Sequence, residues 1–200
     1  MNKKNMTNTI LIVLLIILAA VPQSTFPASA DKYTITLKDI GVAFDLPKAY
    51  SILQQEIVDG RYATVISFGK EFRPRHLKSI DLQLRFWPTA HDGWQNVPGY
   101  TPSQYVDVEF KQVKEGHEQN LPGYHHEPEH VTLFGNKAIR YVYVGFLCCV
   151  SLVGYLRADQ LSGRAAREAR EYLVRIETGG VDDDATQLFD ALPKSLRTTK

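Results

Sequence analysis

The segment SILQQEIVDGRYATVISF, residues 51–68, decides the fold class of this chain of 200 residues. It contains two stretches with the character of β-strands, Ser51–Val58 and Arg61–Phe68, separated by Asp59-Gly60. Asp-Gly is a strong signal for the tight turn of a β-hairpin. So short a connection joins antiparallel neighbours, because parallel strands need a crossover of a dozen residues or more. The segment therefore predicts an antiparallel sheet.

Alternating sequences on both sides of this hairpin extend the predicted sheet. Apolar residues occupy every second position in 33–37, 42–46 and 80–86, which is the period of a half-buried strand. Four more strands are expected in the second half of the chain: Val131–Phe134, Ala138–Val144 after a turn at Gly135-Asn136, Cys148–Arg157 and Tyr172–Glu177.

Three segments predict helices. Thr101-Pro102-Ser103-Gln104 matches a capping box with proline at the first helical position, and a helix of about three turns is expected after it. Leu161–Arg170 has helical composition. Asp182–Asp184 begins the last helix, because negative charge is favourable at a helix N-terminus. Its apolar face holds leucines at 188, 192 and 196, and Pro193 is expected to end it early.

This order of elements predicts an α+β fold, a mostly antiparallel sheet with helices packed against it. The run Phe-x-Leu-Pro-x-x-Tyr at Phe44–Tyr50 is followed by a hairpin, a mid-chain helix and later strands. The last helix ends in Phe-Asp-Ala-Leu-Pro-Lys-Ser-Leu at 189–196. Over residues 33–197 this pattern resembles the PsbP/Mog1-type α/β/α sandwich domains. The resemblance implies a binding or assembly-factor domain without catalysis, and it assigns no functional residue.

The first thirty residues predict a signal peptide. Lys3 and Lys4 precede the apolar run Ile10–Val21, and Ala28-Ser29-Ala30 supplies the small residues of a cleavage site. The run has 12 residues, fewer than the roughly 20 of a membrane-spanning helix. We therefore expect residues 1–30 to be removed, leaving 31–200 as a single α+β domain that is exported to the periplasm or outside the cell. The alternative is a chain tethered by an uncleaved N-terminal helix.

Charge and cysteine content limit the partners of the exported domain. The leader holds two of the 23 basic residues and none of the 22 acidic ones, so the remainder is nearly neutral. This balance argues against nucleic acid as a partner and against stable membrane insertion after leader cleavage. The two cysteines, Cys148 and Cys149, are neighbours in a predicted strand and point to opposite faces. The chain therefore has no disulfide framework.

A predicted loop at Lys114–His130 holds four of the six histidines. The candidate metal ligands are His117, His125, His126, His130 and Glu127, with zinc as the candidate metal. Residues 126–130 match the H-E-x-x-H motif, in which a helix places both histidines of a zinc hydrolase on one face. The proline inside the motif disfavours that helix. A solvated polar loop is the simplest interpretation, and metal binding without catalysis is the broader alternative.

A second loop, around residues 87–104, carries aromatic side chains. Trp87, Trp94 and Tyr100 are candidate ligand-binding residues, because aromatic rings in a loop form platforms for carbohydrate or peptide. The alternative is that they pack in the core. The carboxylates Asp92 and Glu109 stand in unrelated sequence contexts, so they predict no glycosidase pair.

These observations favour an exported non-enzymatic domain that binds a ligand or a protein partner, at the cell envelope or outside the cell. The loops at 87–104 and 114–130 are its expected contact surfaces. The alternative is a metal-binding protein or, further still, a zinc-dependent hydrolase that uses His126, Glu127 and His130.

Overall fold

Two antiparallel sheets and three helices make up the part of the chain that the structure describes. The structure is a computed structural model that describes residues 31–58, 63–69, 82–144, 148–178 and 183–199. The predicted α+β fold is confirmed for these residues. The predicted signal peptide and the Asp59-Gly60 turn lie outside them. No helix within these ranges is long and apolar enough to cross a bilayer.

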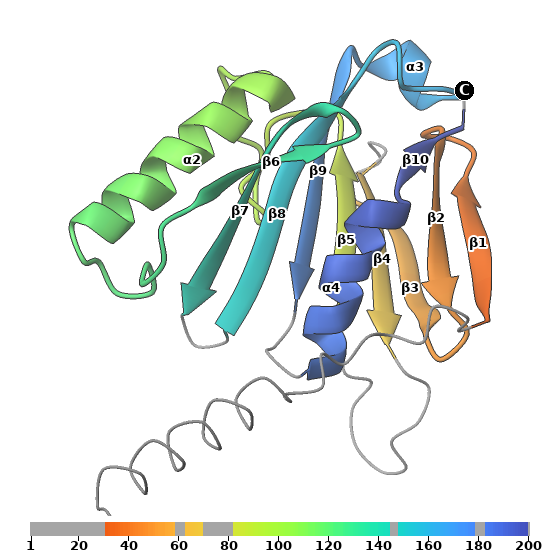
Figure 1. Ribbon diagram of the computed structural model, residues 1–200. Coiled ribbons are helices and arrows are strands. Elements are labelled where there is room, and N and C mark those ends of the chain that lie inside the picture. Colours follow the sequence, from red (N-terminus) through yellow and green to blue (C-terminus); the bar gives the residue numbers. More distant parts are fainter. Residues whose placement is uncertain (1–30, 59–62, 70–81, 145–147, 179–182, 200) are drawn as a thin grey trace, which may run out of the picture. The chain divides into compact units, whose positions relative to one another are not determined.

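The larger sheet consists of β3 (Ser51–Val58), β4 (Ala63–Gly69), β5 (Leu82–Trp87), β6 (Glu129–Leu133), β7 (Asn136–Val144), β8 (Cys148–Arg157) and β9 (Glu171–Thr178). Among the described residues its strand order is β3-β4-β5-β9-β8-β7-β6, and all neighbours are antiparallel (Figure 1). The predicted hairpin forms one edge, with Val58 opposite Ala63. Strands β5 and β9 pair in the middle and join the two halves of the chain.

The smaller sheet has the order β1-β2-β10, with β1 (Lys32–Leu37), β2 (Val42–Pro47) and β10 (Arg197–Thr198). The chain returns to β2 at its end, where Thr199 N–H donates to the Gly41 carbonyl at 2.9 Å. Gly41 has φ +86°, and a Cβ there would lie 2.2 Å from Ser162 Oγ. Only glycine fits this turn without strain or collision.

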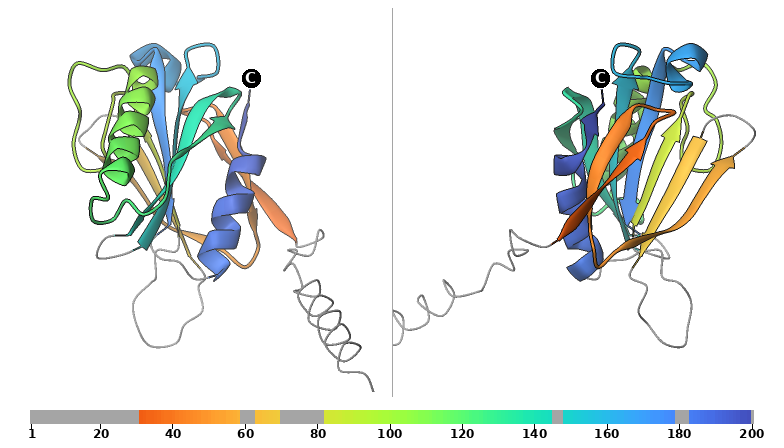
Figure 2. Two further views of the ribbon diagram at one scale, coloured as in Figure 1. Left: turned by 60° about the vertical axis from the view of Figure 1, so that its left-hand side comes forward. Right: turned by 90° about the vertical axis from the view of Figure 1, so that its right-hand side faces the viewer.

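The larger sheet lies in the middle of three layers (Figure 2). Helix α2 (Pro102–Glu118) covers one face, while α4 (Asp183–Ser195) and the smaller sheet cover the other. The main core lies on the second face. There, alternating strand residues such as Leu84, Phe86, Val174 and Ile176 belong to the same buried cluster as Leu188 of α4. A smaller apolar cluster lies under α2: Trp87, Ala90, Tyr105, Val106, Ile139, Val153 and Leu173.

Helix α2 begins where the capping box predicts but is longer than expected. Its 17 residues extend to Glu118, so the predicted loop at Lys114–His130 is too long by one helical turn. Two pairs on the solvent face, Lys111–Glu115 and Lys114–Glu118, have the i,i+4 spacing that supports a helix. The buried face continues as well, because Val113 and Gly116 are buried.

Three further boundaries differ from the sequence prediction. Helix α4 continues through Pro193 to Ser195, because a proline in the last turn removes little of the hydrogen-bond ladder. The hairpin turn after β6 consists of Phe134 and Gly135, with φ of 54° and 75°, so it lies one residue before the predicted position. Within Leu161–Arg170 the only helix is the short α3 (Ala165–Glu168).

Candidate ligand-binding site

A row of polar side chains crosses the face of the larger sheet that α2 covers in part. Ser67 pairs with Gln83, Gln83 with Glu177, Glu177 with Ser151 and Ser151 with Tyr141, on five consecutive strands. Partners in an antiparallel pair point to the same face, so all five side chains share one side of the sheet. Polar groups at an inner face need hydrogen-bond partners, and this row is therefore the start of a network.

The next row of the sheet holds two arginines. Arg85 on β5 and Arg175 on β9 lie directly opposite each other, an arrangement that destabilises a sheet when nothing offsets it. Glu177 lies between them: its Oε2 accepts from Arg85 Nη1 at 3.1 Å, and its Oε1 accepts from Arg175 Nη1 at 3.3 Å. Arg85 also donates to Gln83. One carboxylate thus bridges two cations.

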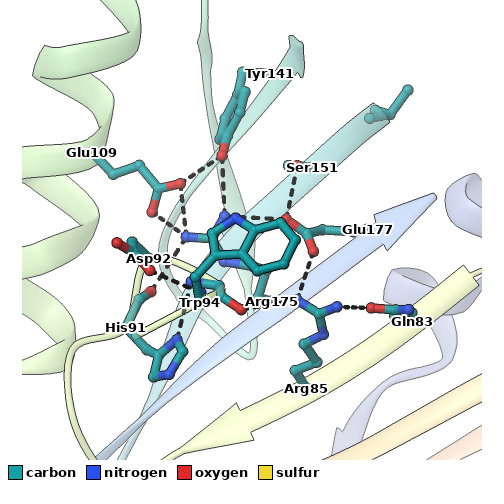
Figure 3. A network of polar contacts seen from close by, with 12 residues as sticks. Gln83, Arg85, His91, Asp92, Trp94, Glu109, Tyr141, Ser151, Arg175 and Glu177 are labelled. Atoms are coloured by element: carbon teal, nitrogen blue, oxygen red, sulfur yellow. Dashed lines mark hydrogen bonds and ion pairs between the residues drawn. The ribbon is translucent and has the colours of Figure 1, made fainter. Parts of the chain in front are cut away.

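A buried ion pair fixes α2 to this network (Figure 3). Arg175 is 1% exposed and Glu109, from α2, is 5% exposed. Arg175 Nη2 donates to both carboxylate oxygens, at 2.8 and 2.7 Å, and the Tyr141 hydroxyl donates to Oε1 at 2.6 Å. Burial raises the pKa of Glu109, and the Arg175 guanidinium opposes that rise. Burial also lowers the pKa of Arg175, but the surrounding acidic groups, Glu109 first among them, together outweigh burial and raise this pKa.

Residues 91–97 form a tight turn beside the network, here named the Trp94 turn. One oxygen of Asp92 accepts the backbone N–H of Trp94 at 2.8 Å and that of Gln95 at 2.9 Å. Burial raises the pKa of Asp92, but these two N–H groups, together with the nearby His91 and Arg175, outweigh burial and hold the pKa below its usual value of 3.8. The side chain of Asp92 thus fixes the backbone on which Trp94 stands.

One more hydrogen bond lies within the Trp94 turn, and three contacts attach the turn to the sheet. His91 Nδ1 accepts the N–H of Gly93 at 3.0 Å, and the His91 ring stacks on Trp87 with centroids 4.3 Å apart. Arg175 Nη2 donates to the His91 carbonyl at 3.4 Å, and Arg85 Nη1 donates to the Gly93 carbonyl at 3.5 Å. The two arginines of the network therefore hold the turn in place (Figure 3).

The structure separates the three aromatic residues that the sequence groups together. Trp94 is 94% exposed at the tip of the turn, whereas Trp87 is 5% exposed and belongs to the apolar cluster under α2. Tyr100 is 46% exposed, just before the start of α2. Of the two alternatives that the sequence leaves open for Trp87, its environment is that of the core, because its ring is buried and stacks on His91. Trp94 and Tyr100 remain exposed candidates.

The predicted metal ligands lie on different elements. His117 is on α2, and its Nδ1 lies 3.2 Å from the Tyr124 carbonyl. His130 is on β6, where its ring stacks on Phe110 at 3.8 Å between centroids. His125, His126 and Glu127 are exposed in the segment between α2 and β6. Among the described residues, no group of three or more His, Cys, Asp or Glu side chains is placed to hold a metal ion.

The segment that matches H-E-x-x-H, residues 126–130, is not helical. Residues 121–128 lie in turns and irregular backbone, and Glu129 and His130 belong to β6. A zinc hydrolase of this type needs both histidines one helical turn apart on the same face. The described backbone of this segment does not provide that geometry. Zinc binding by these residues stays a prediction: His117, His125, His126, His130 and Glu127.

The charged residues of the network were not predicted from the sequence. Arg85, Arg175 and Glu177 alternate with apolar residues in their strands, and this pattern ordinarily indicates a solvent-facing side. Glu109 carried a weak signal, because it lies one turn after Tyr105 and one turn before Val113 on the buried face of α2. A carboxylate on that face requires a buried partner.

Comparisons with known proteins give one structural match to report. No family model matches the chain, and no curated protein matches its sequence. Among solved structures, the chain matches the solution structure of cyanobacterial PsbP (CyanoP) from Synechocystis sp. PCC 6803. The match covers 89% of this chain and 98% of that chain, with 14% identity and a TM-score of 0.41. PsbP is also the family that the order of elements resembles. The function is argued below from the chain's own residues.

Proposed function

We propose that this chain is an exported, non-enzymatic binding domain whose binding site is the Trp94 turn. The observation that carries the proposal is an indole that is 94% exposed on a backbone whose N–H groups donate hydrogen bonds to the side chains of His91 and Asp92. The export part of the proposal is supported by the leader pattern at 1–30.

The physical argument is one of preorganisation. A tryptophan buries about 150–250 Å² when it is covered, so leaving it in water forgoes a large hydrophobic gain. Tryptophan is also among the residues that contribute most to binding free energy. Because the Trp94 turn is already ordered, binding loses little backbone entropy. An exposed ring on a rigid turn is therefore suited to contact a ligand.

The charges beneath the turn support binding rather than acid–base catalysis. Glu109 and Glu177 both accept hydrogen bonds from Arg175, and Glu177 also accepts one from Arg85. A general acid or base must reach the proton that it transfers. Glu109, at 5% exposure, is enclosed between α2 and the sheet.

Site-specific photo-crosslinking in the producing cells tests the proposal. A benzophenone amino acid replaces Trp94 in the full chain, and the matched control carries it at Tyr33, an aromatic residue that is 37% exposed on β1. We expect an adduct from position 94 that is absent from position 33. Benzophenone inserts into C–H bonds, so either a protein or a glycan partner is captured. Equal labelling at both positions, or none at 94, would contradict the proposal.

A further inference from the structure

We infer that the ligand of the Trp94 turn is a neutral saccharide, an inference that rests on the proposed function and specifies its ligand class. It combines three features of the described residues. These are an isolated indole face, amide side chains beside it, and two arginines whose charges are balanced by two carboxylates.

The indole stands in an uncharged segment, and the one carboxylate of the turn, Asp92, is already engaged by the backbone N–H groups of Trp94 and Gln95. From Gly93 to Gln104 the sequence has no Lys, Arg, His, Asp or Glu. Gln95 and Asn96, which follow Trp94 directly, are both exposed. Each amide can donate and accept hydrogen bonds, and sugar hydroxyls require both. Uncharged polar groups around an aromatic ring suit a ligand that is hydroxylated rather than ionic.

The sheet next to the turn adds polar groups without adding net charge. The side chains of Arg85 and Glu177 are 20% and 23% exposed, and Arg85 also contacts the Gly93 carbonyl of the turn. The two arginines of the network, Arg85 and Arg175, are balanced by Glu109 and Glu177. An anionic ligand such as nucleic acid or acidic lipid needs surplus positive charge, and these four groups have none.

The isolation of the ring favours a saccharide over a protein partner. A protein interface of standard size uses about 20–30 residues a side and has an apolar core. The chain neighbours of Trp94 are Gly93 and Gln95, which offer no apolar surface. Within the described part of the chain, Tyr100 is the other exposed large apolar side chain near the turn, and the rest lie on other segments: Tyr33, Leu121, Tyr143 and Val144. One indole face matches the C–H face of a single pyranose ring, because its negative π-surface attracts weakly positive hydrogens.

Fluorescence of a single tryptophan tests this inference. The chain has two tryptophans, so in Trp87→Phe the emission comes from Trp94 alone. We expect a saturable change in its emission with at least one of three neutral probes, cellohexaose, hexa-N-acetylchitohexaose or maltohexaose. Calorimetry with the unmodified chain gives the same affinity by a method that does not depend on the folding of Trp87→Phe.

Two variants locate the site. Trp94→Ala is expected to weaken oligosaccharide binding by more than about tenfold, which is the loss of one well-buried contact. Tyr33→Ala, the matched control on β1, is expected to leave the affinity unchanged. Binding that survives in Trp94→Ala would place the saccharide elsewhere and overturn the inference.

The remaining outcomes separate this inference from the proposed function. No heat and no fluorescence change with any of the three probes at about 10 mM, tenfold above a weak Kd of about 1 mM, overturns the saccharide inference. Tighter binding of polygalacturonate than of the neutral probes overturns it as well. If crosslinking at position 94 then captures a protein, the proposed function stands without the saccharide. If crosslinking also captures nothing, both are wrong.

Discussion

At the scale of single residues, Asp92 and Trp94 illustrate how a polar side chain prepares an apolar one for contact. Asp92 uses one carboxylate oxygen for two backbone N–H groups. Hydrogen bonds to a charged group contribute about 1.5–3 kcal/mol, more than neutral ones do. The exposure of Trp94 is thus maintained by a local turn rather than by contacts of the indole itself.

Replacing Asp92 is expected to loosen the turn. In a Trp87→Phe background, Asp92→Ala should lower the fluorescence anisotropy of Trp94 and speed amide exchange at Trp94 and Gln95 by about tenfold or more, the equivalent of 1.4 kcal/mol. Asp92→Asn is the matched control, because its amide oxygen still accepts both N–H groups. An unchanged anisotropy in Asp92→Ala would show that the sheet contacts alone hold the turn.

The lowered pKa of Asp92 also predicts a pH dependence. Because the folded turn favours the ionised carboxylate, its contribution is complete above pH 3.8 and is lost as the pH falls through the lower folded value. We expect the Trp94 anisotropy to be constant at neutral pH and to fall only in this acidic range. Asp92→Asn should not show the acidic change. A fall that begins near pH 6 would implicate a histidine instead.

At the scale of elements, α2 depends on its cap and on one ion pair. Thr101 Oγ1 accepts the Gln104 N–H at 3.3 Å, and Gln104 Oε1 accepts the Thr101 N–H at 3.0 Å. Ser103 adds two hydrogen bonds to Glu171 on β9, at 2.9 and 3.0 Å. The first turn of the helix is therefore connected to the sheet directly.

Removing the cap is expected to destabilise the domain moderately. Thr101→Ala should lower the free energy of unfolding by about 1 kcal/mol, the usual effect of losing an N-cap side chain. Thr101→Ser keeps the hydroxyl and should stay close to the unmodified chain. Urea denaturation measures both. A Thr101→Ala variant as stable as Thr101→Ser would indicate that the contacts of Ser103 suffice.

The buried pair between α2 and β9 should behave differently when one or both partners are removed. Glu109→Leu leaves Arg175 buried with Glu177 as its remaining carboxylate, and we expect a loss of about 3–5 kcal/mol. The double variant Glu109→Leu/Arg175→Met removes both charges and should recover most of that stability. Urea denaturation of the two variants decides this, and equal losses would contradict it. Although its stability recovers, the double variant should have a more mobile Trp94 than the unmodified chain, because the Arg175 contact with the His91 carbonyl is gone.

At the scale of the whole molecule, the predicted cleavage site after Ala30 directly precedes Asp31, the first residue that the structure describes. The Asp31 carbonyl accepts the Lys48 N–H at 2.9 Å, and β1 begins at Lys32. Cleavage after Ala30 would leave these contacts intact. We expect the exported chain to begin at Asp31, as mass spectrometry of the secreted or periplasmic fraction would show. A chain that keeps residues 1–30 in the membrane fraction would favour the tethered alternative.

Local features of the fold could be predicted because the interactions that determine them are local. The hairpin at residues 51–68 and the capping box at Thr101 each depend on a few consecutive residues. The length of α2 and the course of α4 through Pro193 were misjudged, because burial against the sheet outweighs local breakers. Trp94 was a candidate binding residue from the sequence, but the sequence did not decide whether its ring is exposed or buried.

The amino-acid sequence by itself determined the α+β class, the antiparallel hairpin and the start of α2. Only the tertiary structure decided that β5 lies beside β9, which puts Arg85 opposite Arg175 although 90 positions separate them. It also decided that Trp87 is buried while Trp94 is exposed. The physical reason is that strand periodicity shows which side chains share a face, whereas burial depends on what packs against that face.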